Sequence, residues 1–267
     1  MKRYLVFFAC CVLLPAQVGA PNVGSARFAG HVFAVRGIPA NFLVAKTPWT
    51  SAAAVSFSDA GGLLSQSGTV TLTGPDGASL ADYASGEAAP ILNIDGPLAT
   101  AVAWLPAKHA LLHWNGKAFI LQEVNDSAFA GEVTYVQLNS PRMAKLLVTH
   151  GDATVSAVTV SVETGEVLSA DLLPSAHGHA FVQCSFVLSE EKQGLVVESV
   201  SGERRTITLA QNPLPEGDLS IERMSTDWLH ISSASTGQHW ALFLNSKDLS
   251  LSALPVPPGE SKTEAAQ

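Results

Sequence analysis

Residues 145–170, KLLVTHGDATVSAVTVSVETGEVLSA, contain the pattern that decides the fold of this chain. Three short runs rich in Val, Leu and Thr are separated by Gly151-Asp152 and by Glu163-Thr164-Gly165. β-branched residues favour extended backbone, whereas Gly and Asp favour tight turns, so each run is expected to be a strand joined to the next by a hairpin. The stretch therefore predicts part of a small antiparallel sheet.

The same alternation of strands and turns recurs along the chain at intervals of roughly 40 residues. Five units can be superimposed, and they begin near Ala52, Ala101, Lys145, Ala180 and Ser220. A partial unit precedes them. A four-stranded unit of this length is typical of a β-propeller blade, because a small sheet with two apolar faces must pack between two neighbours, and such an array closes into a ring.

We therefore predict an all-β fold, with a β-propeller of five to six four-stranded blades over residues 27–254. One or two N-terminal strands are expected to complete the last sheet and so close the ring. A pair of β-sandwich domains divided near Pro141 is the structural alternative, since strands spaced by about 8–12 residues suit that fold too. The polar, Pro-rich residues 255–267 are expected to form a disordered tail.

The first twenty residues have the order of a secretory signal peptide. A basic start precedes an apolar run over residues 4–14 and small residues that end at Ala20. The apolar run is too short to cross about 30 Å of hydrocarbon. We expect residues 1–20 to be removed on export, which leaves a secreted or periplasmic protein without stable membrane insertion. Cleavage after Ala16 or near Ala26 is the alternative.

The composition excludes two classes of protein. Only 14% of the 267 residues are charged and 47% are hydrophobic, which excludes a disordered chain. The 15 Lys and Arg face 23 Asp and Glu, for a net charge of −8, which excludes a nucleic-acid binder that works by charge. Removal of Lys2 and Arg3 with the signal leaves 13 basic against 23 acidic residues, so acidic polymers are poor partners.

Cys184 is the only cysteine outside the predicted signal peptide, so no intramolecular disulfide is expected. A core of this size does not need one. Cys184 lies in residues 180–187, whose alternation predicts a strand. A buried structural thiol is favoured over a nucleophile, because no paired base is evident.

Two stretches carry a resemblance to known proteins. Residues 158–167, VTVSVETGEV, resemble the strand–Thr-Gly–strand hairpin of YVTN and quinoprotein-type propeller repeats. Residues 31–44, with RGIPA at 36–40, resemble the opening of uncharacterised exported bacterial propellers of acidobacterial type. The resemblance implies a propeller architecture and brings no catalytic residues with it. The chain departs from the YVTN pattern in its unequal unit lengths and its degenerate fourth unit.

Propellers usually bind through the loops that lead into the innermost strand of each blade, around the central channel. In the predicted register these loops carry Trp49, Asp95, Arg142, His177, His179, Glu216 and Asp218. His177 and His179 could share a metal ion with Asp95 or Glu216 as third ligand. Two exposed histidines in a polar loop are the favoured interpretation, so no metal or cofactor is predicted.

The sequence lacks the G-x-S-x-G, H-E-x-x-H, P-loop, G-x-G-x-x-G and EF-hand motifs. The first functional hypothesis is an exported, non-enzymatic scaffold that binds a protein or cell-envelope partner through its loop-lined top face. The second is a lyase or hydrolase that acts on a carbohydrate or small polymer at the channel mouth, with His177 or His179 paired with Asp95 or Glu216. A structural surface-layer component is the third.

Overall fold

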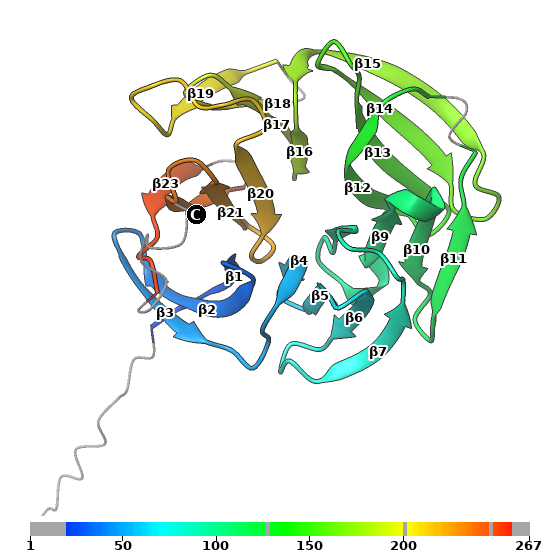
Figure 1. Ribbon diagram of the computed structural model, residues 1–267, viewed down its shortest axis with the longest axis horizontal. Helices are drawn as coiled ribbons and strands as arrows, with labels where there is room; N and C mark the ends of the chain where they lie inside the picture. The colour runs from blue at the N-terminus through cyan, green and yellow to red at the C-terminus, as the bar shows by residue number, and fades with distance from the viewer. Residues whose placement is uncertain (1–19, 126–128, 200–201, 246–247, 258–267) are drawn as a thin grey trace, which may run out of the picture.

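The computed structural model describes residues 20–125, 129–199, 202–245 and 248–257. Within these residues, 23 strands form six antiparallel sheets, each built from consecutive strands, and the sheets stand around a common axis (Figure 1). The fold is a β-propeller, as the sequence predicts. The alternative of two β-sandwich domains is wrong, because six sheets radiate from one axis.

In the described part of the chain the first sheet has three strands and the other five have four. The strands of the first two sheets are β1 (Asn22–Phe28), β2 (His31–Ile38), β3 (Asn41–Lys46), β4 (Ala52–Ser58), β5 (Gly61–Gln66), β6 (Thr69–Thr73) and β7 (Ser79–Ala84). Those of the third and fourth are β8 (Ile91–Asn93), β9 (Val102–Leu105), β10 (Ala110–Trp114), β11 (Phe119–Glu123), β12 (Glu132–Ser140), β13 (Met143–Thr149), β14 (Thr154–Ser161) and β15 (Val167–His177). Those of the fifth and sixth are β16 (Ala180–Gln183), β17 (Phe186–Glu191), β18 (Gly194–Ser199), β19 (Arg204–Thr208), β20 (Leu219–Arg223), β21 (Trp228–Ser233), β22 (His239–Leu244) and β23 (Leu249–Ala253).

In each sheet the first strand along the chain lies nearest the axis (Figure 1). Two short 3-10 helices, η1 (Leu98–Thr100) and η2 (Pro106–Lys108), flank β9. Over the described ranges, no helix has both the length and the apolar character that a membrane span requires.

The apolar faces of the sheets are buried against one another. Leu63 and Leu72 of the second sheet pack with Ala103 and Leu112 of the third. Comparable clusters of buried side chains fill the other gaps around the ring. Each large apolar side chain that is buried in this way contributes about 1.5–3 kcal/mol. The ring is therefore held by hydrogen bonds within the sheets and by side-chain packing between them.

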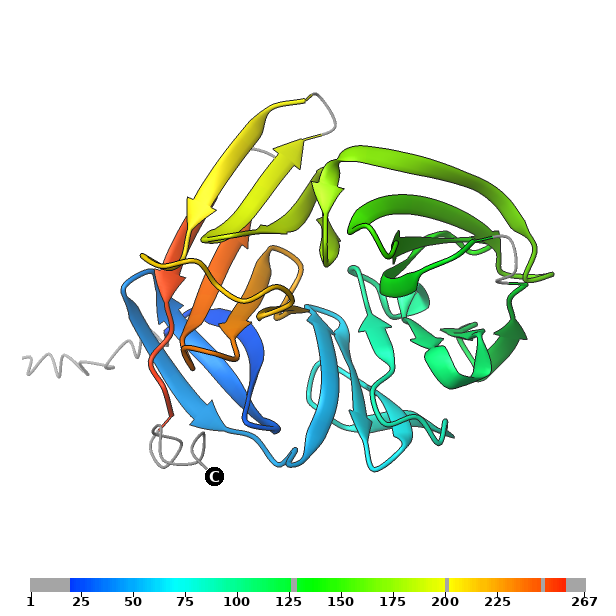
Figure 2. The ribbon, with the colours of Figure 1, turned by 45° about the horizontal axis from the view of Figure 1, so that its top comes forward.

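An N-terminal strand closes the ring, as predicted, but in a different manner. β1 is the inner strand of a separate first sheet and adds no strand to the last one, which β20–β23 form alone. The Ser25 N–H donates to the carbonyl of Met224 at 3.1 Å, and the Ser225 hydroxyl donates to the carbonyl of Val23 at 2.7 Å. Gly24 permits this approach, since a Cβ there would lie 2.2 Å from the Met224 oxygen. Figure 2 shows the two sheets, blue and orange to red, side by side.

The structure corrects the register of two units. The units expected to begin at Ala101 and Lys145 begin one strand earlier, with β8 and β12. β8 has only three residues, too few to show an alternation in the sequence. The second strands are β9, whose four residues are all buried, and β13, in which four of seven residues are buried. Their apolar runs have the pattern that the sequence analysis expects of an innermost strand.

The predicted ends of the chain fall largely outside the described residues. Residues 1–19 of the predicted signal peptide and residues 258–267 of the predicted tail are not among them. The strands run from Asn22 to Ala253.

Candidate functional site

Different loops and turns lie at the two ends of the ring. We call the upper face the end at which the chain enters the innermost strands β4, β8, β12, β16 and β20, and the lower face the opposite end. β1 runs in the other direction, because its start lies against Met224 after β20 and the Gly30 carbonyl after its end accepts from the Ala52 N–H at the start of β4. Because every sheet is an antiparallel meander, the β3–β4, β15–β16 and β19–β20 loops lie on the upper face, together with the β17–β18 and β21–β22 turns. The β8–β9, β12–β13 and β16–β17 connections lie on the lower face.

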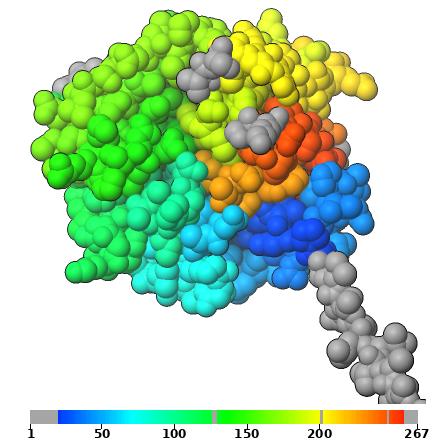
Figure 3. Space-filling view, turned by 180° about the vertical axis from the view of Figure 1, so that it is seen from behind, coloured from blue at the N-terminus to red at the C-terminus, as the bar shows by residue number. Residues whose placement is uncertain are grey.

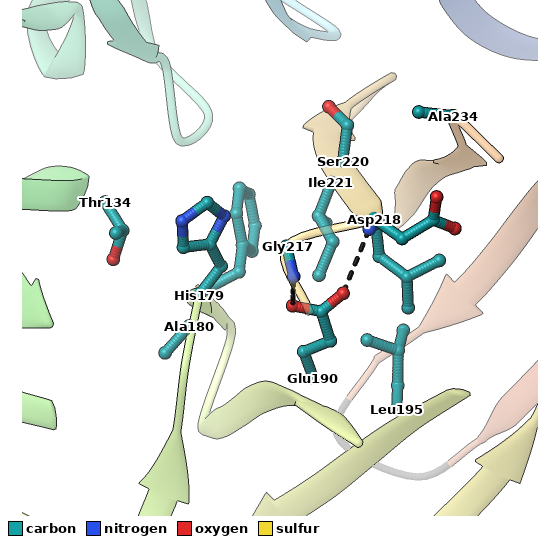
Figure 4. A pocket seen from close by; sticks show the side chains of 12 residues that line it. Thr134, His179, Ala180, Glu190, Leu195, Gly217, Asp218, Ser220, Ile221 and Ala234 are labelled. Atoms are coloured by element: carbon teal, nitrogen blue, oxygen red, sulfur yellow. Dashed lines mark hydrogen bonds between the residues drawn. The ribbon is translucent and has the colours of Figure 1, made fainter. Parts of the chain in front are cut away.

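A cavity of 340 Å³ opens on the upper face, at the mouth of the channel (Figure 4). It lies where the innermost strands β12, β16 and β20 come together. Phe181, Leu195 and Ile221 supply apolar lining, and His179 lies between Thr134 and Ile221 in the view of Figure 4. The volume and the mixture of an apolar wall with a few polar groups suit a binding site.

Glu190 fixes the loop that enters β20. Its two carboxylate oxygens accept hydrogen bonds from the backbone N–H groups of Gly217 and Leu219, both at 3.0 Å (Figure 4). Glu190 also lines a second cavity of 600 Å³. The other residues that line this second cavity are Ala153, His177, Gly178, Glu191, Lys192, Pro213, Leu214, Pro215 and Glu216. We call these two adjacent cavities the upper groove.

Asp218 holds the neighbouring turn in the same manner. Its carboxylate accepts hydrogen bonds from the Ser233 hydroxyl and, at 2.6 Å, from the Ser235 N–H. Burial alone would raise the pKa of Asp218, but these hydrogen bonds outweigh it and hold the pKa below its usual value. The carboxylate is therefore built into the wall of the groove as a structural anion.

Four of the residues singled out in the sequence line the upper groove. His177 and Glu216 lie in the larger cavity, and His179 and Asp218 in the smaller one. The two histidines thus face different cavities. Over the residues that the structure describes, no three His, Cys, Asp or Glu side chains are placed to hold one metal ion.

Trp49 lies away from the upper groove. Its ring packs against Phe57, with the ring centroids 5.7 Å apart, in the cluster between the first and second sheets. A large aromatic ring in the loop before β4 fills the gap between two blades, so packing accounts for the position of Trp49, and the structure does not bring it to the upper groove.

Asp95 and Arg142 lie on the lower face, which corrects their predicted position. Asp95 follows β8 and Arg142 lies in the turn after β12, the two strands that the sequence pattern did not indicate. Because each unit begins one strand earlier than expected, these loops leave the innermost strand instead of entering it. Arg142 forms an exposed ion pair with Glu163 at 3.3 Å. Asp95 therefore cannot join His177 or His179 in one site.

The channel contains a buried arginine that sequence reasoning missed. Arg223, at the end of β20, has a fully buried side chain. Its guanidinium donates to Oδ1 of Asn93 at 3.2 Å and to the carbonyls of Val182 and Thr226 at 3.4 and 3.5 Å, and it forms an ion pair with Asp95 at 3.2 Å. In the space-filling view from behind, the sheets of the ring come together at its centre (Figure 3). Arg223 lies on the same face of β20 as Leu219 and Ile221, and a charged residue at this position of the alternation was the available signal.

Other polar groups complete this network. The Tyr135 hydroxyl donates to the carbonyl of Val182 at 3.0 Å, and Nε2 of Gln183 donates to the carbonyl of Thr226 at 2.6 Å. Burial raises the pKa of Tyr135, so its hydroxyl stays protonated. The network ties β8, β12, β16 and β20 together, which assigns the channel residues a structural role.

Cys184 departs from the predicted buried strand. It occupies the turn between β16 and β17 with φ of 54°, and the residue is exposed. The thiol itself is partly shielded from solvent, and this partial burial, with Asp227 and Asp95 nearby, raises the pKa of Cys184. A thiol with a raised pKa is a poor nucleophile, so the position carries no catalytic signal.

No family model matches the chain, and no curated protein matches it. Solved structures of similar fold include the β-propeller domain of Myceliophteria thermophila Cps50 (Swd1), with 11% identity, 90% of this chain and 89% of that chain covered, and a TM-score of 0.47. Kuenenia stuttgartiensis hydrazine synthase matches with 10% identity over 80% of this chain and 70% of that chain, at a TM-score of 0.46. Kluyveromyces lactis Hsv2 matches with 11% identity over 86% and 83%, at 0.40. These values concern the fold alone, and the propeller assignment rests on the strand order.

Proposed function

We propose that this chain is an exported, non-enzymatic propeller that binds a protein or cell-envelope partner through the upper groove. The observation that supports this function is the pair of adjacent cavities, 340 and 600 Å³, that share Glu190 at the channel mouth. The loops around them are held rigidly by Glu190 and Asp218, and a preorganised surface lowers the entropic cost of binding.

The charge of the groove favours a partner segment with a basic side chain. Glu190, Glu216 and Asp218 stand against one cation, Lys192, while Glu191 is paired with Arg204 at 2.9 Å. Charge complementarity of this kind contributes specificity and a faster encounter more than it contributes affinity.

A variant pair tests this function. Ser220→Arg places a large cation in the exposed part of the smaller cavity, whereas Leu80→Arg changes a half-exposed side chain on β7, outside the groove. A partner captured from the cell envelope by the unchanged protein should be lost with Ser220→Arg and retained with Leu80→Arg. Equal retention, or equal loss, by both variants would contradict the assignment.

The hydrolase or lyase alternative keeps one of its expected pairs, because His177 and Glu216 line the same larger cavity, whereas its pairs with Asp95 and the pairing of His179 with Glu216 are not brought into one cavity. Asp95 lies on the opposite face, and His177 and His179 line different cavities. Both carboxylates of the smaller cavity are engaged by backbone N–H groups. If His177 and His179 are nevertheless replaced together and a hydrolytic activity of the purified protein is abolished, the enzymatic hypothesis returns.

Export remains part of the proposal. Cleavage after Ala20 would leave β1 whole, since that strand begins at Asn22, whereas cleavage near Ala26 would remove most of it. We expect the N-terminal sequence of the exported protein to begin at Pro21. A start at Met1 in the exported fraction would exclude signal cleavage.

A further inference from the structure

The junction between the first and last sheets contains a group of titratable side chains that the proposed binding function does not use. Arg27 and Phe28 come from β1, and Glu222, His230 and His239 come from β20, β21 and β22. We call these five residues the closure seam. His230 is 1% exposed and is the one buried histidine in the described ranges.

An ion pair joins the two sheets at the seam. Nε of Arg27 donates to Oε1 of Glu222 at 2.8 Å, and a terminal guanidinium nitrogen lies 2.7 Å from the same oxygen. The side chains are 27% and 12% exposed. Burial alone would raise the pKa of Glu222, but the contacts with His230 and Arg27 outweigh it and hold the pKa below its usual value.

The two histidines form a stacked, hydrogen-bonded pair against β1. Nε2 of His230 lies 2.9 Å from Nδ1 of His239, and the rings are 7° from parallel with centroids 5.1 Å apart. The ring of Phe28 packs on both, at centroid distances of 5.2 and 4.6 Å. In such a hydrogen bond one nitrogen donates and the other accepts, so the pair tolerates at most one added proton.

The other ring nitrogen of His230, Nδ1, faces Glu222. This nitrogen lies 3.7 Å from Oε2 of Glu222 and forms no hydrogen bond. A second proton added to the pair would put a hydrogen on both facing nitrogens, Nε2 of His230 and Nδ1 of His239, so that neither could accept. It would also place a further positive charge beside Arg27. The groups that act on His239 from the packed elements are His230, Glu222 and Arg27, and burial together with the repulsion from His230 lowers the pKa of His239 to about 4.

We propose that the closure seam is an acid-sensitive latch: when both imidazoles of the His230–His239 pair carry a proton, the first sheet separates from the last and the ring opens at this junction. Among the described residues no strand is shared across this contact, so it rests on side-chain packing, the Arg27–Glu222 ion pair and two hydrogen bonds to the Met224–Ser225 segment. The other junctions within the described residues contain no buried histidine. The inference stands independently of the partner-binding proposal.

Hydrogen–deuterium exchange of the full exported chain between pH 7 and pH 3.5, corrected for the intrinsic exchange rate, tests the latch. Peptides from β1 and β20 should lose about tenfold or more of their protection as the pH falls through the range near 4, while β13 and β14 of the fourth sheet keep theirs. Simultaneous loss of protection in all six sheets would overturn the proposal.

A matched pair of variants locates the effect. His239→Gln retains a hydrogen-bonding side chain that takes no proton, and it should abolish the acid-induced opening or move it to lower pH by about one unit or more. His113→Gln, at a half-buried histidine on β10 whose pKa is also lowered by burial, should leave the opening unchanged. If His239→Gln fails to fold, His239→Phe keeps a ring against Phe28 and serves in its place. An unchanged midpoint in the His239 variant would refute the latch.

Discussion

Replacement of Arg223 by methionine is the sharpest test of the channel network. The substitution keeps a long side chain but removes the guanidinium that links β20 to β8 and β16. Oδ1 of Asn93, in a fully buried residue, loses its donor at a cost of about 1–3 kcal/mol. Asp95 is 27% exposed and regains water, so its loss is about 1 kcal/mol.

The two carbonyl contacts of Arg223 add little to this sum. They are long, at 3.4 and 3.5 Å, and the carbonyls of Val182 and Thr226 keep their bonds from Tyr135 and Gln183. The free energy of unfolding should therefore fall by about 2–4 kcal/mol in total. Urea denaturation measures this as a lower midpoint at an unchanged m-value.

The control is another arginine of the lower face. Arg142→Met breaks an ion pair whose side chains are 82% and 64% exposed, and it should change the free energy by less than about 0.5 kcal/mol. In an Asp95→Asn background the cost of Arg223→Met should shrink, because the two residues are coupled. A loss below about 1 kcal/mol for Arg223→Met in the unchanged background would refute the reasoning.

Two further predictions concern the closure and the lower face. Gly24→Ala should lower the free energy of unfolding in urea by about 2–4 kcal/mol, because the new Cβ would lie 2.2 Å from the Met224 oxygen and the residue has φ of 139°. Gly116→Ala has open space around it and should lower the free energy by about 1 kcal/mol. Equal losses in the two variants would contradict the close approach at Gly24. Cys184 should react with iodoacetamide in the folded protein, and mass spectrometry measures the extent of this reaction. The reaction should be slower at pH 7 than that of a free thiol and should become faster as the pH rises, because the pKa of Cys184 is raised. No reaction at pH 9 would contradict the exposure of Cys184.

Local signals in the sequence were sufficient to predict the architecture. Hairpins such as the one around Thr164-Gly165 are encoded by adjacent residues, and their repetition gives the blade unit. The predicted start of two blades is wrong, because one innermost strand is very short and because two second strands have the apolar pattern expected of an innermost strand. β8 is three residues long, and the apolar runs of β9 and β13 resemble innermost strands.

The site was predictable only in part, for the same reason. His179 and Glu216 lie in the loops that enter β16 and β20, two innermost strands that the sequence pattern indicated, and His177 ends β15 beside them. The structure places all three around one groove. Asp95 and Arg142 depend on the misplaced strands and lie on the other face. The bond between Arg223 and Asn93 joins residues 130 positions apart, and no local pattern encodes such a contact.

The separate first sheet has a consequence for how the chain acquires its structure. Every strand pairs only with its immediate neighbour along the chain, so each sheet is complete as soon as its own segment of some 25 to 45 residues is available. Sequence-local pairing of this kind favours rapid folding. In a propeller whose last sheet takes its outer strand from the N-terminus, that sheet cannot form until both ends of the chain are available. In this chain each sheet can form in turn, and the last step is the docking of the completed last sheet against the completed first sheet.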